Sequence, residues 1–174
     1  QNLYLGWLYA LKPLLEGAET RKGYPTYMTT QAYEDRLLTA ACASWAQLRH
    51  DTILYAKQSY TKSWEGASHP PPRIVGFVEP LPAFYDRMNA LCVMMNMGLK
   101  NLGAGSKNAQ TRLERLSEMS RELARISRDE LAGKELTQGD YDWIKDFAVS
   151  VKSVLKPAHG ELDERALRTD IVAE

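Results

Sequence analysis

The chain has 174 residues, and its 22 basic residues balance 22 acidic ones. A chain of this length buries roughly two thirds of the surface that its unfolded form exposes, which allows one domain with a hydrophobic core. The balanced charge removes the broad electrostatic footprint of a protein that binds nucleic acid through its charge, and no stretch approaches the roughly 20 apolar residues that span a bilayer. We therefore expect no nucleic acid partner and no membrane span.

The first part of the chain predicts two helices separated by a surface loop. Apolar residues recur at helical spacing over residues 3–15, and Pro13 lies near the end of this helix. Residues 16–25 are polar and contain glycine and proline, which indicates a loop. A longer helix is predicted from Thr29 or Thr30, either of which can cap it, to about residue 60. Its expected core face consists of Leu38, Ala41, Trp45, Leu48, Thr52 and Tyr55.

The second part predicts three more helices. Pro82 suits the first turn of the third helix, whose expected apolar stripe is Met88, Leu91, Met95, Leu99 and Leu102. Residues 107–132 predict the fourth helix, with an expected apolar stripe of Leu113, Leu116, Leu123 and Ile126. Thr137 and Asp140 have the spacing of a capping box that opens the fifth helix, and Pro157 ends it.

The remaining segments lack helical periodicity. A long loop at about residues 61–82 contains the proline triplet at 70–72, and a polar tail occupies about residues 157–174. Both ends of the sequence have the character of cuts, so we interpret the chain as a fragment of a larger protein. The predicted fold class is all-α: an irregular bundle of about five helices with a long Pro-rich loop, forming a single helical domain or part-domain over residues 1–174.

Two cysteines lie on predicted helices among apolar residues. For Cys42 and Cys92 we expect buried free thiols, with a disulfide between them as the alternative.

The densest cluster of chemically versatile side chains is on the second predicted helix. His50, Asp51, Lys57 and Tyr60 bring an imidazole, a carboxylate, an amine and a phenol within three helical turns, and they are the candidate catalytic residues. His50 and Asp51 are adjacent, so they point about 100° apart on a helix and cannot form a base and its orienting partner with each other. The interpretation that we prefer is a structural histidine and a solvated or ion-paired lysine. The sequence contains no catalytic motif, so an enzymatic role stays uncertain.

Metal and cofactor sites are not predicted. The three histidines, His50, His69 and His159, are far apart in the sequence, and no HExxH, CxxC or EF-hand pattern is present. The glycines between residues 98 and 105 do not follow a strand or lead to a Lys-Ser/Thr pair, so no phosphate-binding loop is indicated.

Several segments resemble a known family. The longest is SWAQLRHDTILYAKQSYT (residues 44–61), and LGWLYALKPLL (5–15), GYP (23–25), GFVEP (76–80) and LTQGDYDWI (136–144) agree in the same order. Together they resemble a bacterial and archaeal family filed as a domain of unknown function, numbered thirty-one sixty. The resemblance implies a longer parent chain with a β-rich C-terminal portion and an extracytoplasmic location, which is periplasmic, lipoprotein-anchored or extracellular. It implies no reaction and no catalytic residues.

Three functional hypotheses follow. The one we prefer is a helical scaffold or binding module of an exported cell-envelope protein, which packs against the remainder of its parent polypeptide or another protein chain. The second is part of an envelope hydrolase that uses His50, Asp51, Lys57 or Tyr60 together with residues of a missing portion. The third is a structural subunit of a surface assembly held by the apolar residues 74–78.

Overall fold

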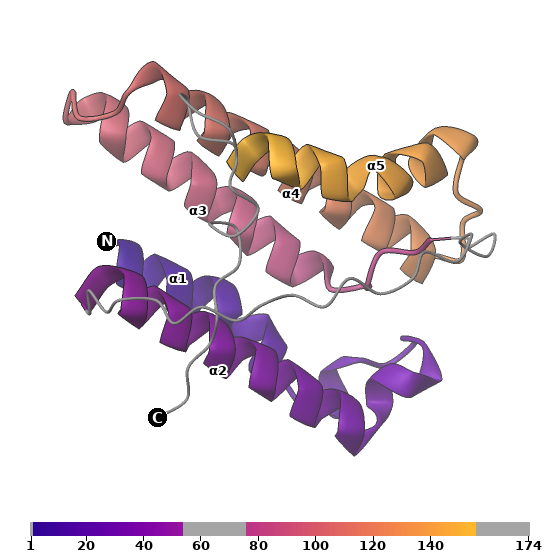
Figure 1. Ribbon diagram of the computed structural model, residues 1–174. Helices are drawn as coiled ribbons and strands as arrows, with labels where there is room; N and C mark the ends of the chain where they lie inside the picture. Colours follow the sequence, from indigo (N-terminus) through magenta and orange to yellow (C-terminus); the bar gives the residue numbers. More distant parts are fainter. Residues whose placement is uncertain (1, 54–75, 156–174) are drawn as a thin grey trace, which may run out of the picture.

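The computed structural model describes residues 2–53 and 76–155, and within these ranges it has five α-helices, three short 3-10 helices and no strand. Figure 1 shows two layers, and α1 (Leu3–Leu11) and α2 (Gln31–Ile53) form the first. The second layer consists of α3 (Pro82–Asn101), α4 (Lys107–Leu131) and α5 (Gln138–Leu155). The predicted all-α bundle of five helices is confirmed. The predicted tail and most of the predicted loop lie outside the described residues.

The first predicted helix changes type before its end. α1 stops at Leu11 and the chain continues as the 3-10 helix η1 (Lys12–Leu15), with Pro13 in its first turn. Proline has no N–H to donate to the carbonyl four residues earlier, so the α-helical hydrogen bonds end and a tighter turn follows. Asn2 caps the start of α1, because its side chain accepts a hydrogen bond from the Leu5 N–H at 2.9 Å.

The buried face of α2 differs from the predicted one. Thr30 caps the helix as predicted, with its hydroxyl accepting from the Tyr33 N–H at 3.3 Å. The prediction is confirmed for Ala41 and Leu48 but is wrong for Leu38 and Trp45, which are 52% and 37% exposed. At 100° per residue, the buried face is rotated by about 45° from the expected one. The reason is that α2 packs against η1 and η3 (Thr26–Thr29). The side that faces them buries Tyr33, Leu37, Ala41 and Leu48.

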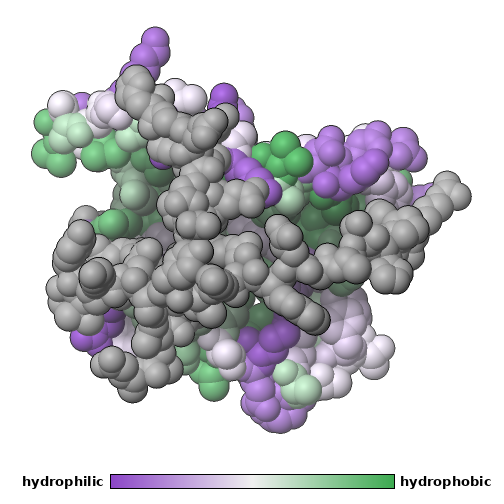
Figure 2. Space-filling view, viewed as in Figure 1, coloured by the Kyte–Doolittle hydropathy of each residue, from purple (hydrophilic) through white to green (hydrophobic). Residues whose placement is uncertain are grey.

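α3 and α4 form an antiparallel hairpin and make the most extensive helix contact in the described residues. In the turn between them Gly103 has a φ of 61°, a left-handed conformation that glycine adopts without strain. The hydroxyl of Ser106 caps α4 by accepting from the Ala109 N–H at 3.1 Å. One residue of each predicted stripe is wrong: Leu102, at the end of α3, is 79% exposed, and Leu116 of α4 is at the surface. Figure 2 shows hydrophobic side chains at the corner where α3 ends and α4 begins.

The predicted capping box opens α5. The Thr137 hydroxyl accepts from the Asp140 N–H at 3.2 Å, and the Asp140 carboxylate accepts from the Thr137 N–H at 2.8 Å. α5 also packs closely on residues 76–81, which precede α3. A Cβ atom added to Gly76 would lie 2.6 Å from Cγ2 of Ile144, so the approach of this segment to α5 requires glycine.

The core lies between the two layers, around η1. Buried side chains from η1, η3, α2 and the start of α3 meet there, and Trp7, Tyr24, Phe84 and Tyr85 pack around them. The buried members are Leu11, Leu14, Met28, Tyr33, Leu37, Ala41 and Leu81. Arg87 of α3 joins the layers by donating to the Tyr9 carbonyl at 3.0 Å while its guanidinium stacks over the Tyr9 ring.

The two cysteines are free and differ in exposure. Cys92 is buried, as expected, but Cys42 is exposed, because it lies on the side of α2 that faces away from η1. Burial raises the pKa of the Cys92 thiol, which makes it a poor nucleophile. Within residues 2–53 and 76–155 no helix is long and apolar enough to cross a bilayer.

Candidate functional site

The side chains of the predicted catalytic residues are not among those that the structure describes. His50 and Asp51 belong to the last turn of α2, which ends at Ile53. Their side chains, together with the whole of Lys57 and Tyr60, lie outside the described residues. The hypothesis of a hydrolase site on this helix therefore stays a prediction.

A cleft of about 560 Å³ lies where the end of α4 meets two irregular segments. One segment is the turn before and within η3, and the other is the extended stretch that leads into α3; both are at the right of Figure 1. We call this the tyrosine cleft. It is lined by Gly23, Tyr24, Pro25, Thr26, Tyr27, Phe77, Val78, Pro80, Glu130 and Leu131. Its volume is in the range of small-ligand sites, and its walls are mainly aromatic and apolar.

The local sequence places the aromatic rings at the cleft. Gly23 has a φ of 85°, which turns the chain sharply, and Pro25 then precedes η3. This turn presents Tyr24 and Tyr27 on the same side. Tyr27 also packs edge-to-face on Tyr33 of α2, with ring centroids 5.6 Å apart, and the side chain stays 45% exposed.

A buried arginine holds this turn in place through hydrogen bonds to its backbone. Arg21 is only 4% exposed, and its guanidinium donates to the carbonyl oxygens of Glu16 and Met28, the latter at 3.4 Å. It lies 3.7 Å from the carboxylate of Glu34, which also accepts from the Ala18 N–H at 2.6 Å. One side chain therefore ties both ends of the turn to α2, so the cleft wall is held before any ligand arrives.

Among the described residues that line the cleft, one carries a carboxylate: Glu130, in the last turn of α4. Its Oε1 accepts from the Val78 N–H at 3.0 Å, and its Oε2 is buried with no hydrogen-bond partner among the described residues. Burial raises the pKa of Glu130 above the ordinary value of 4.5, although the Val78 N–H opposes that shift. No described residue compensates the charge of this partly buried carboxylate, and perturbed groups of this kind are frequent at functional sites.

Tyrosine hydroxyls and a second carboxylate lie behind the cleft. Glu79 pairs with Arg36, and its backbone carbonyl accepts from the Tyr85 hydroxyl at 3.0 Å. The Tyr33 hydroxyl is buried without a hydrogen-bond partner among the described residues. Burial raises the pKa of both Tyr33 and Tyr85, and the nearby carboxylate of Glu79 raises it further. These phenols therefore stay protonated at neutral pH and do not act as bases.

Two substitutions of Glu130 separate its hydrogen bond from its charge. Glu130→Ala leaves the Val78 N–H unpaired and is expected to lower the free energy of unfolding by about 1–3 kcal/mol. Glu130→Gln keeps an acceptor for Val78 and removes the charge, so its stability at neutral pH is expected to equal or exceed that of the wild type. Urea denaturation of both variants measures the difference.

The pH dependence gives a second readout for Glu130. Because the folded-state pKa is raised, ionisation favours the unfolded chain, and the wild type loses stability as pH rises from about 4.5 through the folded-state value. The difference in the free energy of unfolding between Glu130→Gln and the wild type should therefore grow, in favour of the variant, between pH 4 and neutral pH. A constant difference across this range would show that Glu130 is not under-compensated.

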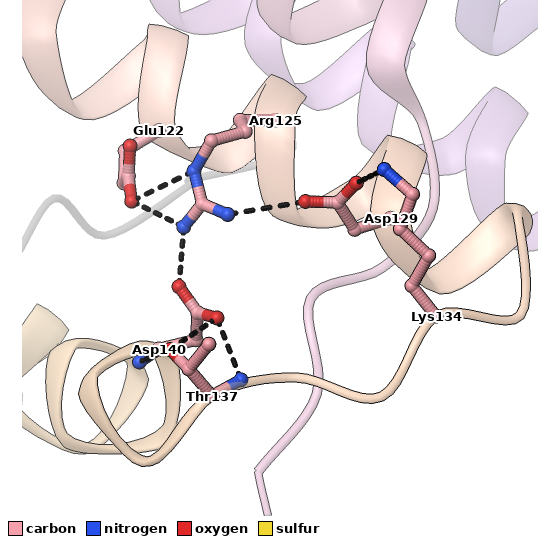
Figure 3. Close-up of polar contacts among 6 residues, drawn as sticks. All are labelled: Glu122, Arg125, Asp129, Lys134, Thr137 and Asp140. Atoms are coloured by element: carbon pink, nitrogen blue, oxygen red, sulfur yellow. Dashed lines mark hydrogen bonds and ion pairs between the residues drawn. The ribbon is translucent and has the colours of Figure 1, made fainter.

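A network around Arg125 fixes the end of α4 that carries Glu130 (Figure 3). Arg125 donates to Glu122 and to Asp129 at 3.1 Å each, and it pairs with Asp140 at the start of α5. Lys134 donates to the other oxygen of Asp129 at 2.7 Å. Each of these carboxylates has a partner within the network, so the network positions α4 against α5 and does not present a vacant charge.

The tyrosine cleft has the size of a ligand site, and its described lining contains no histidine, cysteine, serine or lysine. Its hydroxyl groups belong to Thr26, Tyr24 and Tyr27, and the one hydrogen bond of Glu130 among the described residues is to the Val78 N–H, so no hydroxyl there is paired with a base. Among residues 2–53 and 76–155 no three histidine, cysteine or acidic side chains form a group that would hold a metal ion. The described groups therefore support recognition by ring faces, prolines and one carboxylate.

This site is not among the candidate sites that the sequence predicts. Its residues come from segments 23–27, 76–80 and 130–131, which are far apart in the chain and carry no catalytic motif. A signal was nevertheless present, because the short segments GYP (23–25) and GFVEP (76–80) both contribute to the family resemblance and each places an aromatic residue in an irregular region. The fold brings these two segments to the same cleft.

The chain was compared with known proteins at the level of sequence and structure. No curated protein and no solved structure matches it. One family profile matches over residues 1–174, and its description is "Protein of unknown function (DUF3160)". The chain therefore belongs to this family, whose function is unknown.

Proposed function

We propose that the chain is a helical binding module, which contacts the remainder of its parent polypeptide or another protein through the tyrosine cleft. The family resemblance supports an exported protein of the cell envelope as the setting: periplasmic, lipoprotein-anchored or extracellular.

The observation that carries the proposal is the exposure of aromatic rings at the cleft. Phe77 is 66% exposed and Tyr27 is 45% exposed, beside the apolar surface of Pro25 and Pro80. Aromatic residues are enriched in protein interfaces, because they bury a large apolar area and lose few rotatable bonds. Arg21 already holds one wall in place, which lowers the ordering cost of binding.

Site-specific photocrosslinking tests the proposal in the native parent protein. Phe77 is replaced by a photoreactive benzoyl-phenylalanine, which preserves an aromatic ring at the cleft. Val149 of α5, which is 68% exposed, receives the same residue as a matched control. We expect one dominant crosslink from position 77, either to another part of the parent chain or to one protein, with at least a several-fold lower yield from position 149.

The identity of the crosslinked peptide separates the hypotheses. Equal, diffuse labelling from both positions would contradict a binding site at the cleft. A crosslink between identical chains would support the surface-assembly alternative, for which Phe77 is the exposed member of the apolar segment 74–78 among the described residues. The hydrolase alternative rests on His50, Asp51, Lys57 and Tyr60, and the crosslink does not test it.

A further inference from the structure

The described residues of the tyrosine cleft do not balance its charge. They include the carboxylate of Glu130 and no arginine, lysine or histidine. The carboxylate makes one hydrogen bond, to the Val78 N–H, and has no ion pair with any described residue. The acidic groups around Arg125 differ, because each of them has a cationic partner. A ligand that enters the cleft therefore meets a carboxylate in a partly desolvated wall whose negative charge no described residue compensates.

Among the described residues, the aromatic rings of the cleft have no guanidinium group stacked on them, whereas other rings of the chain do. The ring of Tyr33 has guanidinium groups on it, from Arg21 at 5.5 Å and Arg36 at 5.2 Å. Arg87 and Arg49 stack in the same way over Tyr9 and Trp45. By contrast, no guanidinium of the described residues lies over Tyr24, Tyr27 or Phe77. The faces of aromatic rings attract cations, and a planar guanidinium stacks on them particularly well.

We propose that the tyrosine cleft takes an arginine side chain of the bound polypeptide, with its guanidinium against Tyr24, Tyr27 or Phe77 and its charge balanced by Glu130. This inference rests on the proposed function and names the chemistry of the occupant. The aromatic and proline surfaces accommodate the aliphatic stem, while the guanidinium supplies the missing positive charge. An anionic group is disfavoured by Glu130, and a neutral group leaves that carboxylate unbalanced.

The inference is tested with capped pentapeptides that carry one central residue between glycine and serine residues. Arginine is compared with citrulline, which has nearly the same shape and no charge, and with lysine, which has the charge without the planar fork. Binding to the isotopically labelled 174-residue chain is followed by NMR. We expect saturable shifts of Tyr24, Tyr27, Phe77 and Val78, and affinities for citrulline and lysine that are roughly tenfold and several-fold weaker, respectively.

Glu130→Gln is the matched variant, since it keeps the acceptor for the Val78 N–H and removes only the charge. It should lower the affinity for the arginine peptide to that of the citrulline peptide, while shifts remote from the cleft stay unchanged. Equal affinity for arginine and citrulline would overturn the inference, as would equal affinity for arginine and lysine. Saturable shifts confined to the network around Asp129 would also overturn it.

The crosslinking experiment and the peptide-binding experiment test different claims, so a negative result in one can be told apart from a negative result in the other. A specific crosslink from position 77 combined with no saturable arginine binding would leave the binding module in place and remove arginine as its occupant. Diffuse crosslinking combined with saturable arginine binding at Tyr27 and Phe77 would instead establish the cleft as an arginine site while contradicting a polypeptide partner in the parent protein.

Discussion

Arg21→Met is expected to lower the free energy of unfolding by about 3–5 kcal/mol, because it removes a buried guanidinium that donates to two backbone carbonyl groups and lies 3.7 Å from the partly exposed carboxylate of Glu34. The carbonyl oxygens of Glu16 and Met28 would lose their donor, and the carboxylate of Glu34 would lose its cation. The methionine side chain fills a similar volume but offers no hydrogen bond. Arg21→Lys retains the charge without the fork that reaches two carbonyl groups, so it should recover only part of the loss.

Arg36→Met provides a matched control for this substitution. Arg36 also stacks over the Tyr33 ring and also pairs with a glutamate, Glu79, but its side chain is 59% exposed. Solvent screens an exposed ion pair, so the control is expected to cost less than about 1 kcal/mol. Urea denaturation monitored by circular dichroism compares the variants. Equal losses for the two substitutions would mean that Arg21 is not the buried support of the turn that carries Tyr24 and Tyr27.

Leu37→Ala is expected to destabilise the chain by about 2–5 kcal/mol, because the side chain is 2% exposed and lies in the core beside η1. Truncation removes buried apolar surface and leaves a cavity among rigid neighbours. Leu38→Ala is the adjacent and chemically identical change on a side chain that is 52% exposed. It should alter the free energy of unfolding by no more than about 0.5 kcal/mol.

The comparison of Leu37 with Leu38 tests the orientation of α2 directly. The sequence pattern favours Leu38 as the core residue, whereas the structure buries Leu37. The midpoint and slope of a denaturant titration distinguish a change in stability from a change in the unfolded state. A larger loss for Leu38→Ala than for Leu37→Ala would restore the orientation that the pattern predicts and would move the contact with η1 to the other side of the helix.

The tyrosine cleft depends on the same packing. Tyr33 of α2 is buried in the core and supports the Tyr27 ring, and Arg21 contacts both Tyr33 and the carbonyl oxygen of Met28. If α2 were rotated to the orientation that the sequence pattern predicts, Tyr33 would no longer contact the Tyr27 ring. A stable core and a preformed binding wall are therefore two results of one helix orientation.

The sequence alone determined the five helices, the starts of α3, α4 and α5 and the end of α3, because those depend on local chemistry. Proline in the first turn of α3, Gly103 after that helix, Ser106 before α4 and the reciprocal bonds of Thr137 and Asp140 all act within four residues. Tertiary structure decided which side of α2 is buried, since apolar residues surround that helix and only the position of η1 selects among them. It also decided the site: Tyr24, Phe77 and Glu130 meet at one cleft only through long-range packing, which no local pattern encodes.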